Sequence, residues 1–256
     1  MKKVSWLLVF SFILILTSIG CSTAKTEPTE IMVSAAASMK DSITELQKAY
    51  ALKKPEVKLT INFGASGTLQ QQIEQGAPTD LFISAGKTQM DALETKNLLV
   101  KESRFDLLGN DLVLVTGKDN SKVTSLEDLA KADKISIGTP ESVPAGKYAK
   151  ESFTSLKLWD ALQPKIVYAK DVTQVLNYVE TGNVDAGLVY QSDAQGSTKV
   201  KVVTVVPASS HSAIVYPAAI ILATKNKQAA EDFLKYLQSS DAQKVFVKYG
   251  FKTLAK

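Results

Sequence analysis

The sequence predicts an α/β protein, in which strands and helices alternate along most of the chain. Short apolar runs recur, and each is followed by apolar residues at helical spacing. Turns of Gly, Ala and Ser join the two kinds of segment. The chain has 256 residues, of which 45% are apolar. That is enough for one large α/β domain or for two smaller lobes, each with its own core.

The first predicted unit, residues 31–41, sets the pattern for the others. A buried strand at residues 31–33 leads through three alanines to Ser38, a predicted helix cap, and Asp41 completes a capping-box pattern. Apolar residues at helical spacing follow. A helix N-terminus presents free N–H groups and a positive dipole end, which suit an anion. The alternative interpretation is an ordinary strand-to-helix turn.

The remaining elements follow in the same alternating order. Further strands are expected at residues 57–63, 81–85, 112–116, 135–137, 165–169, 184–190 and 199–206. Further helices are expected around residues 69–76, 90–93, 124–132, 144–156, 173–182, 230–237 and 245–249. The apolar run 213–223 contains Pro217, which cannot donate to a sheet ladder. This run is therefore an edge strand, a bulge or a crossing point.

Residues 1–20 are predicted to be an export signal peptide. Lys2 and Lys3 precede an apolar run at 4–16 that is too short for a resident transmembrane helix. The tripeptide 18–20 and Cys21 resemble a bacterial lipobox, in which the cysteine becomes the lipidated first residue. The lipobox usually begins with Leu or another aliphatic residue, where this chain has serine.

The prediction is therefore an exported protein that is lipid-anchored at Cys21 to the outer face of the cell membrane, or else periplasmic. Residues 21–29 would form a polar, flexible tether. The alternative is plain secretion with cleavage nearby. Cys21 is the only cysteine, so the mature body has neither disulfides nor thiol chemistry.

Charge and composition exclude several function classes. The net charge is +4, and Arg104 is the only arginine, so a nucleic-acid partner is not expected. His211 is the only histidine, which leaves no Ser/His or Cys/His catalytic arrangement and no ligand set for a transition-metal cation. The motifs G-x-S-x-G, G-x-G-x-x-G and G-x-x-x-x-G-K-[ST] are absent from the sequence.

Four turns of small or hydroxyl-bearing residues each stand before a predicted helix. They lie at residues 37–38, 65–68, 144–146 and 171–173. Small residues let a ligand approach the backbone closely, and hydroxyl groups add neutral donors. If the four helix starts converge, they form an anion site without any formal positive charge. Strand-to-helix turns favour these residue types in any case.

The motifs, taken in order, resemble the molybdate-binding proteins of bacterial molybdenum ABC transporters. The resemblance covers about residues 30–251. The matching segments are Ala35-Ala36-Ala37-Ser38, Ser66-Gly67-Thr68-Leu69 through Ala85, 107–110, 140–150, 170–172, 187–194 and Tyr249-Gly250-Phe251. Each segment alone is weak evidence, whereas the ordered combination is specific.

The resemblance implies a two-lobed periplasmic-binding-protein fold of type II, in which the chain crosses twice between the lobes. The crossings are expected near residues 108–111 and 212–217. Lobe 1 would comprise residues 30–108 and 215–256, and lobe 2 residues 109–214. The Gly109-Asn110 break and Pro217 fit these places independently.

The resemblance also implies that an oxyanion binds between the lobes. Ser38 and Ser66 would donate through hydroxyl and backbone groups from lobe 1. Ala145 and Val172 would donate backbone N–H groups from lobe 2, and Tyr190 would donate its hydroxyl. All except Tyr190 lie on the small-residue turns.

The function expected from this resemblance is a non-enzymatic, monomeric receptor that captures molybdate, and also tungstate, for the membrane permease of an ABC importer. No cofactor is expected, and molybdenum would be bound as an oxyanion rather than as a free cation. A receptor for another tetrahedral oxyanion, above all sulfate, is the nearest alternative. A secreted enzyme acting on a phosphate ester and a structural surface lipoprotein are the alternatives from other classes.

Overall fold

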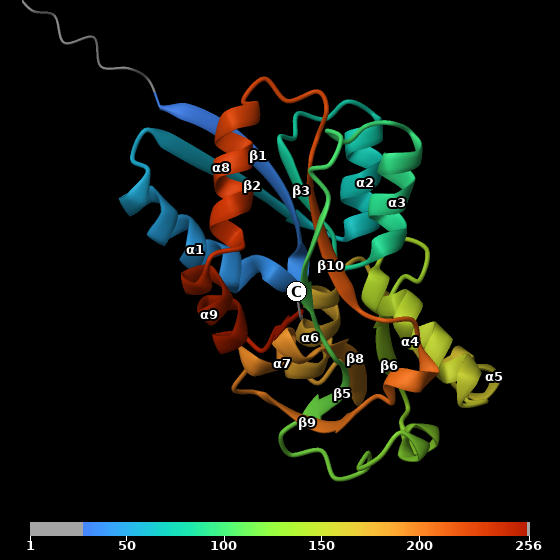
Figure 1. Cartoon of the computed structure of the whole chain (residues 1–256). Helices are drawn as coiled ribbons and strands as arrows, with labels where there is room; N and C mark the ends of the chain where they lie inside the picture. Colours follow the sequence, from blue (N-terminus) through green and yellow to red (C-terminus); the bar gives the residue numbers. More distant parts are fainter. Residues whose placement is uncertain (1–27, 255–256) are drawn as a thin grey trace, which may run out of the picture.

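The computed structural model describes residues 28–254, which form two lobes, each built on one β-sheet (Figure 1). The sheet of the first lobe has the strand order β11-β4-β10-β3-β1-β2, and that of the second has the order β7-β6-β8-β5-β9. The first sheet consists of β1 (Thr29–Ala36), β2 (Val57–Gly64), β3 (Leu81–Ile83), β4 (Phe105–Gly109), β10 (Val215–Ile220) and β11 (Lys252–Thr253). The second consists of β5 (Leu112–Gly117), β6 (Ile135–Gly138), β7 (Ile166–Ala169), β8 (Ala186–Tyr190) and β9 (Val200–Val205).

Helices cover both sheets (Figure 1). Those of the first lobe are α1 (Lys40–Lys53), α2 (Ser66–Glu74), α3 (Lys87–Thr95), α8 (Lys227–Leu237) and α9 (Ser240–Lys248). Those of the second are α4 (Pro144–Ser155), α5 (Trp159–Leu162), α6 (Val172–Glu180) and α7 (Gln191–Gln195). Four 3-10 segments, η1 to η4, lie at Ala37–Met39, Glu127–Lys131, Gln163–Lys165 and Ala208–Ser210. Among the described helices, none has the length and apolar character needed to cross a membrane.

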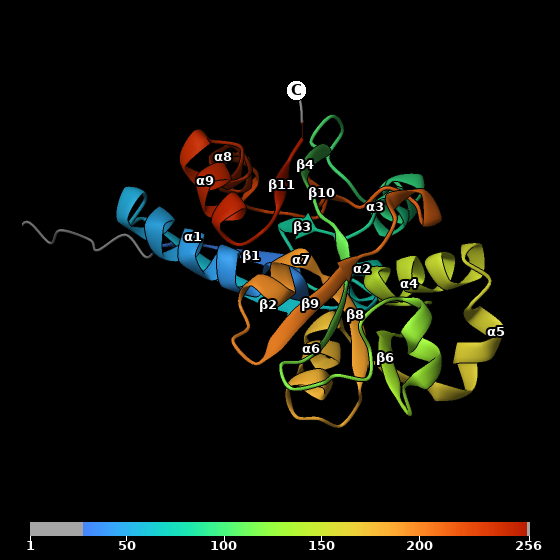
Figure 2. The ribbon, with the colours of Figure 1, turned by 90° about the horizontal axis from the view of Figure 1, so that it is seen from below.

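The chain passes twice between the sheets, as predicted. Asn110 and Asp111 connect β4 of the first sheet to β5 of the second, and the segment after β9 returns to β10. Gly109 pairs with Val215 in an antiparallel ladder, so the two crossings lie side by side. Figure 2 shows both passing between the lobes. The lobe boundaries expected from the sequence stay a prediction.

Strand β1 directs the first small-residue turn toward the second lobe. Ile31, Val33 and Ala35 are fully buried, because β1 is paired in parallel with β2 and β3 and carries helices on its faces. Its carboxyl end leads directly into η1 and α1. The turn of small residues is therefore held by the core of the first lobe while its tip faces the second.

Three local predictions are corrected by the structure. Ser38 does not cap a helix, because α1 begins at Lys40 with Met39 as its N-cap and no side-chain cap bond. The capping-box interpretation is therefore wrong, and the Ser38 hydroxyl bonds elsewhere. The helix expected at residues 124–132 is the short 3-10 segment η2. The edge-strand alternative for residues 213–223 is also wrong, because β10 lies between β3 and β4 with a register shift at Tyr216/Pro217.

Candidate functional site

A small cavity lies between the two lobes. The first lobe lines it with Ala36, Ala37, Ser38, Gly64, Ala65, Ser66 and Ala85, and the second with Val143, Pro144, Ala145, Asp171, Val172 and Tyr190. The structure thus brings together all five residues that the sequence predicts for the site. All four small-residue turns contribute to the lining, although they are far apart in the sequence.

In the first lobe, Ser66 is held in place by a backbone donor. It is the first residue of α2, is 1% exposed, and its Oγ accepts a hydrogen bond from the amide of Ala85 at 2.9 Å. Because Oγ already accepts from a fixed N–H, its own hydrogen is free to donate to a ligand. The N-cap residue Ala65 has an extended backbone, with φ −63° and ψ 135°, so α2 begins at Ser66.

Ser38 lies on η1, half-buried, beside the return crossing. Its Oγ is 2.9 Å from the hydroxyl oxygen of Tyr216 on β10. Both side chains carry a hydroxyl group, so each could be the donor in this bond. Its direction decides whether Ser38 offers a ligand a donor or an acceptor.

The second lobe presents helix N-termini to the cavity. Pro144 is the first residue of α4 and Ala145 the second, while Val172 is the first of α6. The backbone N–H groups of Ala145 and Val172 have no acceptor within their own helix, and the helix dipole adds a partial positive charge. Asp171 caps α6, since its Oδ1 accepts from Gln174 N at 2.8 Å.

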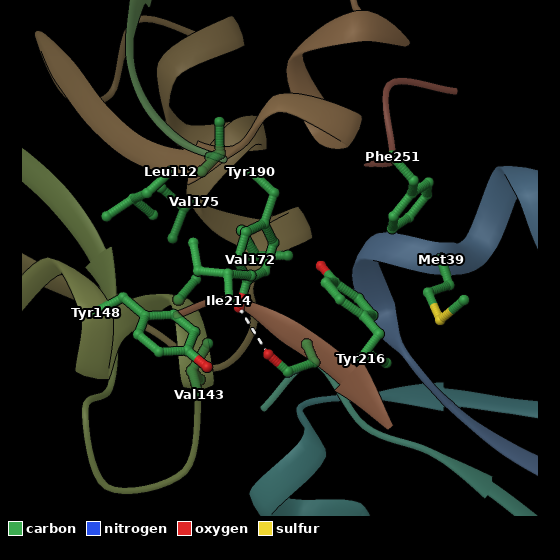
Figure 3. Packing of buried hydrophobic residues seen from close by; sticks show 14 of the residues in the cluster. Met39, Leu112, Val143, Tyr148, Val172, Val175, Tyr190, Ile214, Tyr216 and Phe251 are labelled. Carbon is green, nitrogen blue, oxygen red and sulfur yellow. Dashed lines mark hydrogen bonds between the residues drawn. The ribbon is translucent and has the colours of Figure 1, made fainter. Parts of the chain in front are cut away.

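Tyr190 ends β8 and reaches across to the first lobe. Its hydroxyl donates to the carbonyl of Ala85 at 3.4 Å, the dashed contact in Figure 3. This distance is at the long end for a hydrogen bond, so a stronger acceptor would compete for the proton. Burial raises the pKa of the Tyr190 hydroxyl, which therefore stays protonated as a donor.

The corner between β8 and α7 is fixed by a carboxyl group. Asp193 Oδ2 accepts a hydrogen bond from the backbone amide of Tyr190 at 3.0 Å. Burial, with smaller contributions from Asp171 and Asp41, raises the pKa of the Asp193 carboxyl to about 7. This bond holds the end of β8, and with it the Tyr190 ring, in position beside the cavity.

Next to the cavity the two lobes are in direct contact. The backbone amide of Gly67 on α2 donates to the carbonyl of Ser142 in the second lobe at 2.9 Å. A Cβ placed on Gly67 would lie 2.6 Å from that carbonyl oxygen and 2.8 Å from Ser142 Cα. The contact therefore requires glycine, and it holds the lobes in a closed arrangement.

The polar groups of this cavity suit a small anion with acceptor oxygens. Among the described residues that line it, none is Lys, Arg, His or Cys. Hydroxyl groups and helix-terminal amides are the donors that face it. Within residues 28–254, no cluster of three or more His, Cys, Asp or Glu side chains could hold a metal ion.

Comparison with known proteins identifies the family. The family profile described as bacterial extracellular solute-binding protein matches residues 31–252. The chain belongs to this family. Its periplasmic-binding-protein fold is therefore the two-lobed α/β fold that the sequence predicts, and solute-binding proteins of this kind serve transport.

Three members of this solute-binding family are closely similar to the chain. The putative ABC transporter substrate-binding lipoprotein YvgL of Bacillus subtilis is 49% identical, covering 91% of this chain and 92% of the relative. The molybdate-binding protein ModA of Haemophilus influenzae is 41% identical, covering 98% and 99%. The solved substrate-binding domain of a putative molybdenum ABC transporter from Clostridium difficile is 48% identical, covers 89% of this chain and all of that chain, and gives a TM-score of 0.70.

Sequence reasoning missed several neighbours of the site. Ala85 donates its amide to Ser66 in the first lobe and accepts from Tyr190 of the second, and the sequence marks it only as the end of a strand. Asp171 lines the cavity besides capping α6. Tyr216 is hydrogen-bonded to Ser38, and Asn110 is hydrogen-bonded to Tyr216. No local sequence pattern predicts either contact. Cys21, the predicted lipid-attachment residue, lies outside the described residues.

Proposed function

We propose that this protein is the extracytoplasmic molybdate receptor of an ABC importer. It captures molybdate, or the closely similar tungstate, in the cavity between its lobes and delivers the anion to the membrane permease. The observation that carries the proposal is the convergence of neutral donors from both lobes on one small cavity. The relatives named as molybdate-binding, which match the chain over nearly its full length, support the choice of anion.

The predicted residues take the roles that their positions permit. Ser38 and Ser66 donate hydroxyl and backbone hydrogens from the first lobe. Ala145 and Val172 donate backbone hydrogens from two helix N-termini, which suit a dianion. Tyr190 exchanges its long bond to the Ala85 carbonyl for one to an anionic oxygen, since bonds to charged acceptors are about twice as strong.

Several further features belong to the proposal. The protein performs no covalent chemistry, acts as a monomer, and consists of lobe 1 at residues 30–108 and 215–256 and lobe 2 at 109–214. It is anchored through a lipid on Cys21, which the name of the lipoprotein relative from Bacillus subtilis supports. Cys21→Ser should release the protein from the membrane fraction of its host. Wild-type protein found wholly in the medium would exclude the anchor.

Competition titration of molybdate, tungstate, sulfate and phosphate on one sample tests the anion assignment. Sulfate oxygens lie closer to their central atom, and rigid donors from two lobes cannot all follow them inward. Stretching several charge-assisted bonds should cost about 4 kcal/mol, roughly a thousandfold in affinity. Tungstate should match molybdate closely, because the two anions are nearly equal in size. Sulfate binding within about tenfold of molybdate would favour the sulfate-receptor alternative.

A further inference from the structure

A chain of hydrogen bonds runs from the crossings between the lobes to the cavity. It joins Asn110 on the first crossing, Tyr216 on the return crossing and Ser38 on η1. Asn110 is 7% exposed and Tyr216 is fully buried. The Tyr216 ring packs edge-on against that of Tyr190, with centroids 5.7 Å apart (Figure 3).

The orientation of the Asn110 amide is fixed by its backbone neighbour. Asn110 Oδ1 accepts a hydrogen bond from the backbone N–H of Asp111 at 2.9 Å, and a backbone N–H can only donate. The NH₂ group must therefore point the other way. It donates to Ser192 Oγ at 2.9 Å and to the hydroxyl oxygen of Tyr216 at 3.3 Å.

This arrangement sets the direction of the next bond. The Tyr216 oxygen accepts from Asn110, and among the described hydrogen bonds Ser38 Oγ, 2.9 Å away, is the only acceptor for the single Tyr216 proton. Burial, the largest influence, raises the pKa of the Tyr216 hydroxyl, so this proton stays in place at neutral pH. Ser38 Oγ is then an acceptor toward Tyr216, and its own hydrogen is free for the cavity.

We propose that Asn110 and Tyr216 are positioning residues that keep the Ser38 hydroxyl a donor toward the ligand. This inference rests on the proposed function. Ser66 reaches the same state by a simpler route, because its oxygen accepts from the Ala85 amide.

The test compares four proteins by titration with molybdate. They are the wild type, Tyr216→Phe, Ser38→Ala and the double variant. Tyr50→Phe is the matched control, because it removes another buried hydroxyl, one that has no hydrogen-bond partner in the described structure. Thermal unfolding without ligand verifies that each variant folds.

Tyr216→Phe should weaken molybdate binding about tenfold, equivalent to about 1.4 kcal/mol, because the Ser38 hydrogen is then free to turn away from the ligand. It should add no further loss in the Ser38→Ala background, because it acts through Ser38. The proposal would be overturned if Tyr216→Phe lowered the affinity for molybdate equally with and without Ser38→Ala. It would also be overturned if Tyr216→Phe bound molybdate as tightly as Tyr50→Phe does.

Asn110→Asp provides a second variant if Tyr216→Phe does not fold. A carboxylate cannot donate to Tyr216, so the bonds reverse and Ser38 is turned to donate toward Tyr216 instead of the ligand. Molybdate binding should weaken, and unchanged binding would contradict the proposed direction of the bonds. Failure of the wild-type protein to bind molybdate would instead overturn the proposed function.

Discussion

The two lobes line one cavity but fix their donors by different means. The first lobe contributes hydroxyl groups, each held by a hydrogen bond with a neighbour: the amide of Ala85 for Ser66 and the hydroxyl of Tyr216 for Ser38. The second contributes mainly backbone amides, whose positions are set by packing. We therefore expect side-chain chemistry to decide binding in the first lobe and packing to decide it in the second.

Glycines show how tightly the second lobe is packed behind its donors. A Cβ on Gly146 of α4 would lie 1.9 Å from the carbonyl oxygen of Gly138, at the end of β6. A Cβ on Gly138 would lie 2.4 Å from a side-chain carbon of Val143. The first turn of α4 is thus pressed against the strand, which places the Ala145 amide at the cavity.

The largest effect is expected from Gly146→Ala, which challenges the packing of the second lobe. The new methyl group overlaps backbone that cannot move aside, so the free energy of unfolding should fall by about 3 kcal/mol. Denaturant unfolding without ligand measures this. Gly117→Ala is the control, since its Cβ would meet nothing closer than 3.9 Å. Equal stability of the two variants would contradict the role of packing.

Next come the serines, which test the chemistry of the first lobe. Ser66→Ala should weaken molybdate binding by about 1.5–3 kcal/mol, because it removes a hydrogen bond to a charged ligand. Ser38→Ala should behave similarly. Ser34→Ala, a buried serine bonded to Thr79 and outside the cavity lining, is the matched control for calorimetry. If Ser34→Ala weakened molybdate binding as much as Ser66→Ala, the proposed hydrogen bond from Ser66 to the ligand would be contradicted.

Gly67→Ala tests the contact between the lobes without altering any donor proposed for the ligand. Its methyl group would prevent the approach to Ser142 only when the lobes are closed. Binding should weaken by about 1–2 kcal/mol, while unfolding without ligand should change little. Small-angle scattering should show a smaller radius of gyration with molybdate for the wild type, but a reduced change for the variant. Full closure of the Gly67→Ala variant with molybdate would contradict the proposed role of the Gly67–Ser142 contact.

Val172→Ala should have the smallest effect on binding. The ligand contact proposed for this residue is its backbone amide, so the affinity for molybdate should stay within about 0.5 kcal/mol of wild type. Because Val172 is only 4% exposed, the free energy of unfolding should still fall by about 1 kcal/mol. A large loss of affinity without a loss of stability would show that the side chain itself contacts the ligand.

The α/β class follows from the alternating segments, which are a local pattern, whereas the two lobes and the five site residues came from the family resemblance. The structure places all five at the cavity, four of them on small-residue turns. Alternating segments and small-residue turns are visible at Ser66 or Ala145 without knowledge of the tertiary structure. The wrong predictions concern residues whose partners are distant. Ser38 was interpreted as a helix cap, but its partner is Tyr216, which lies 178 positions away. Pro217 signals an interrupted ladder, yet only the sheet order shows that β10 is internal and bulged.

The internal position of β10 also constrains the order of folding. All strands of the second sheet lie within residues 112–205, so that lobe can form from one continuous stretch of chain. The first sheet cannot join β3 to β4 until Val215–Ile220 arrives between them. Contacts so distant in sequence form slowly, because a long loop must close first. During export from the N-terminus, the second lobe can therefore be complete while the first still lacks its central strand.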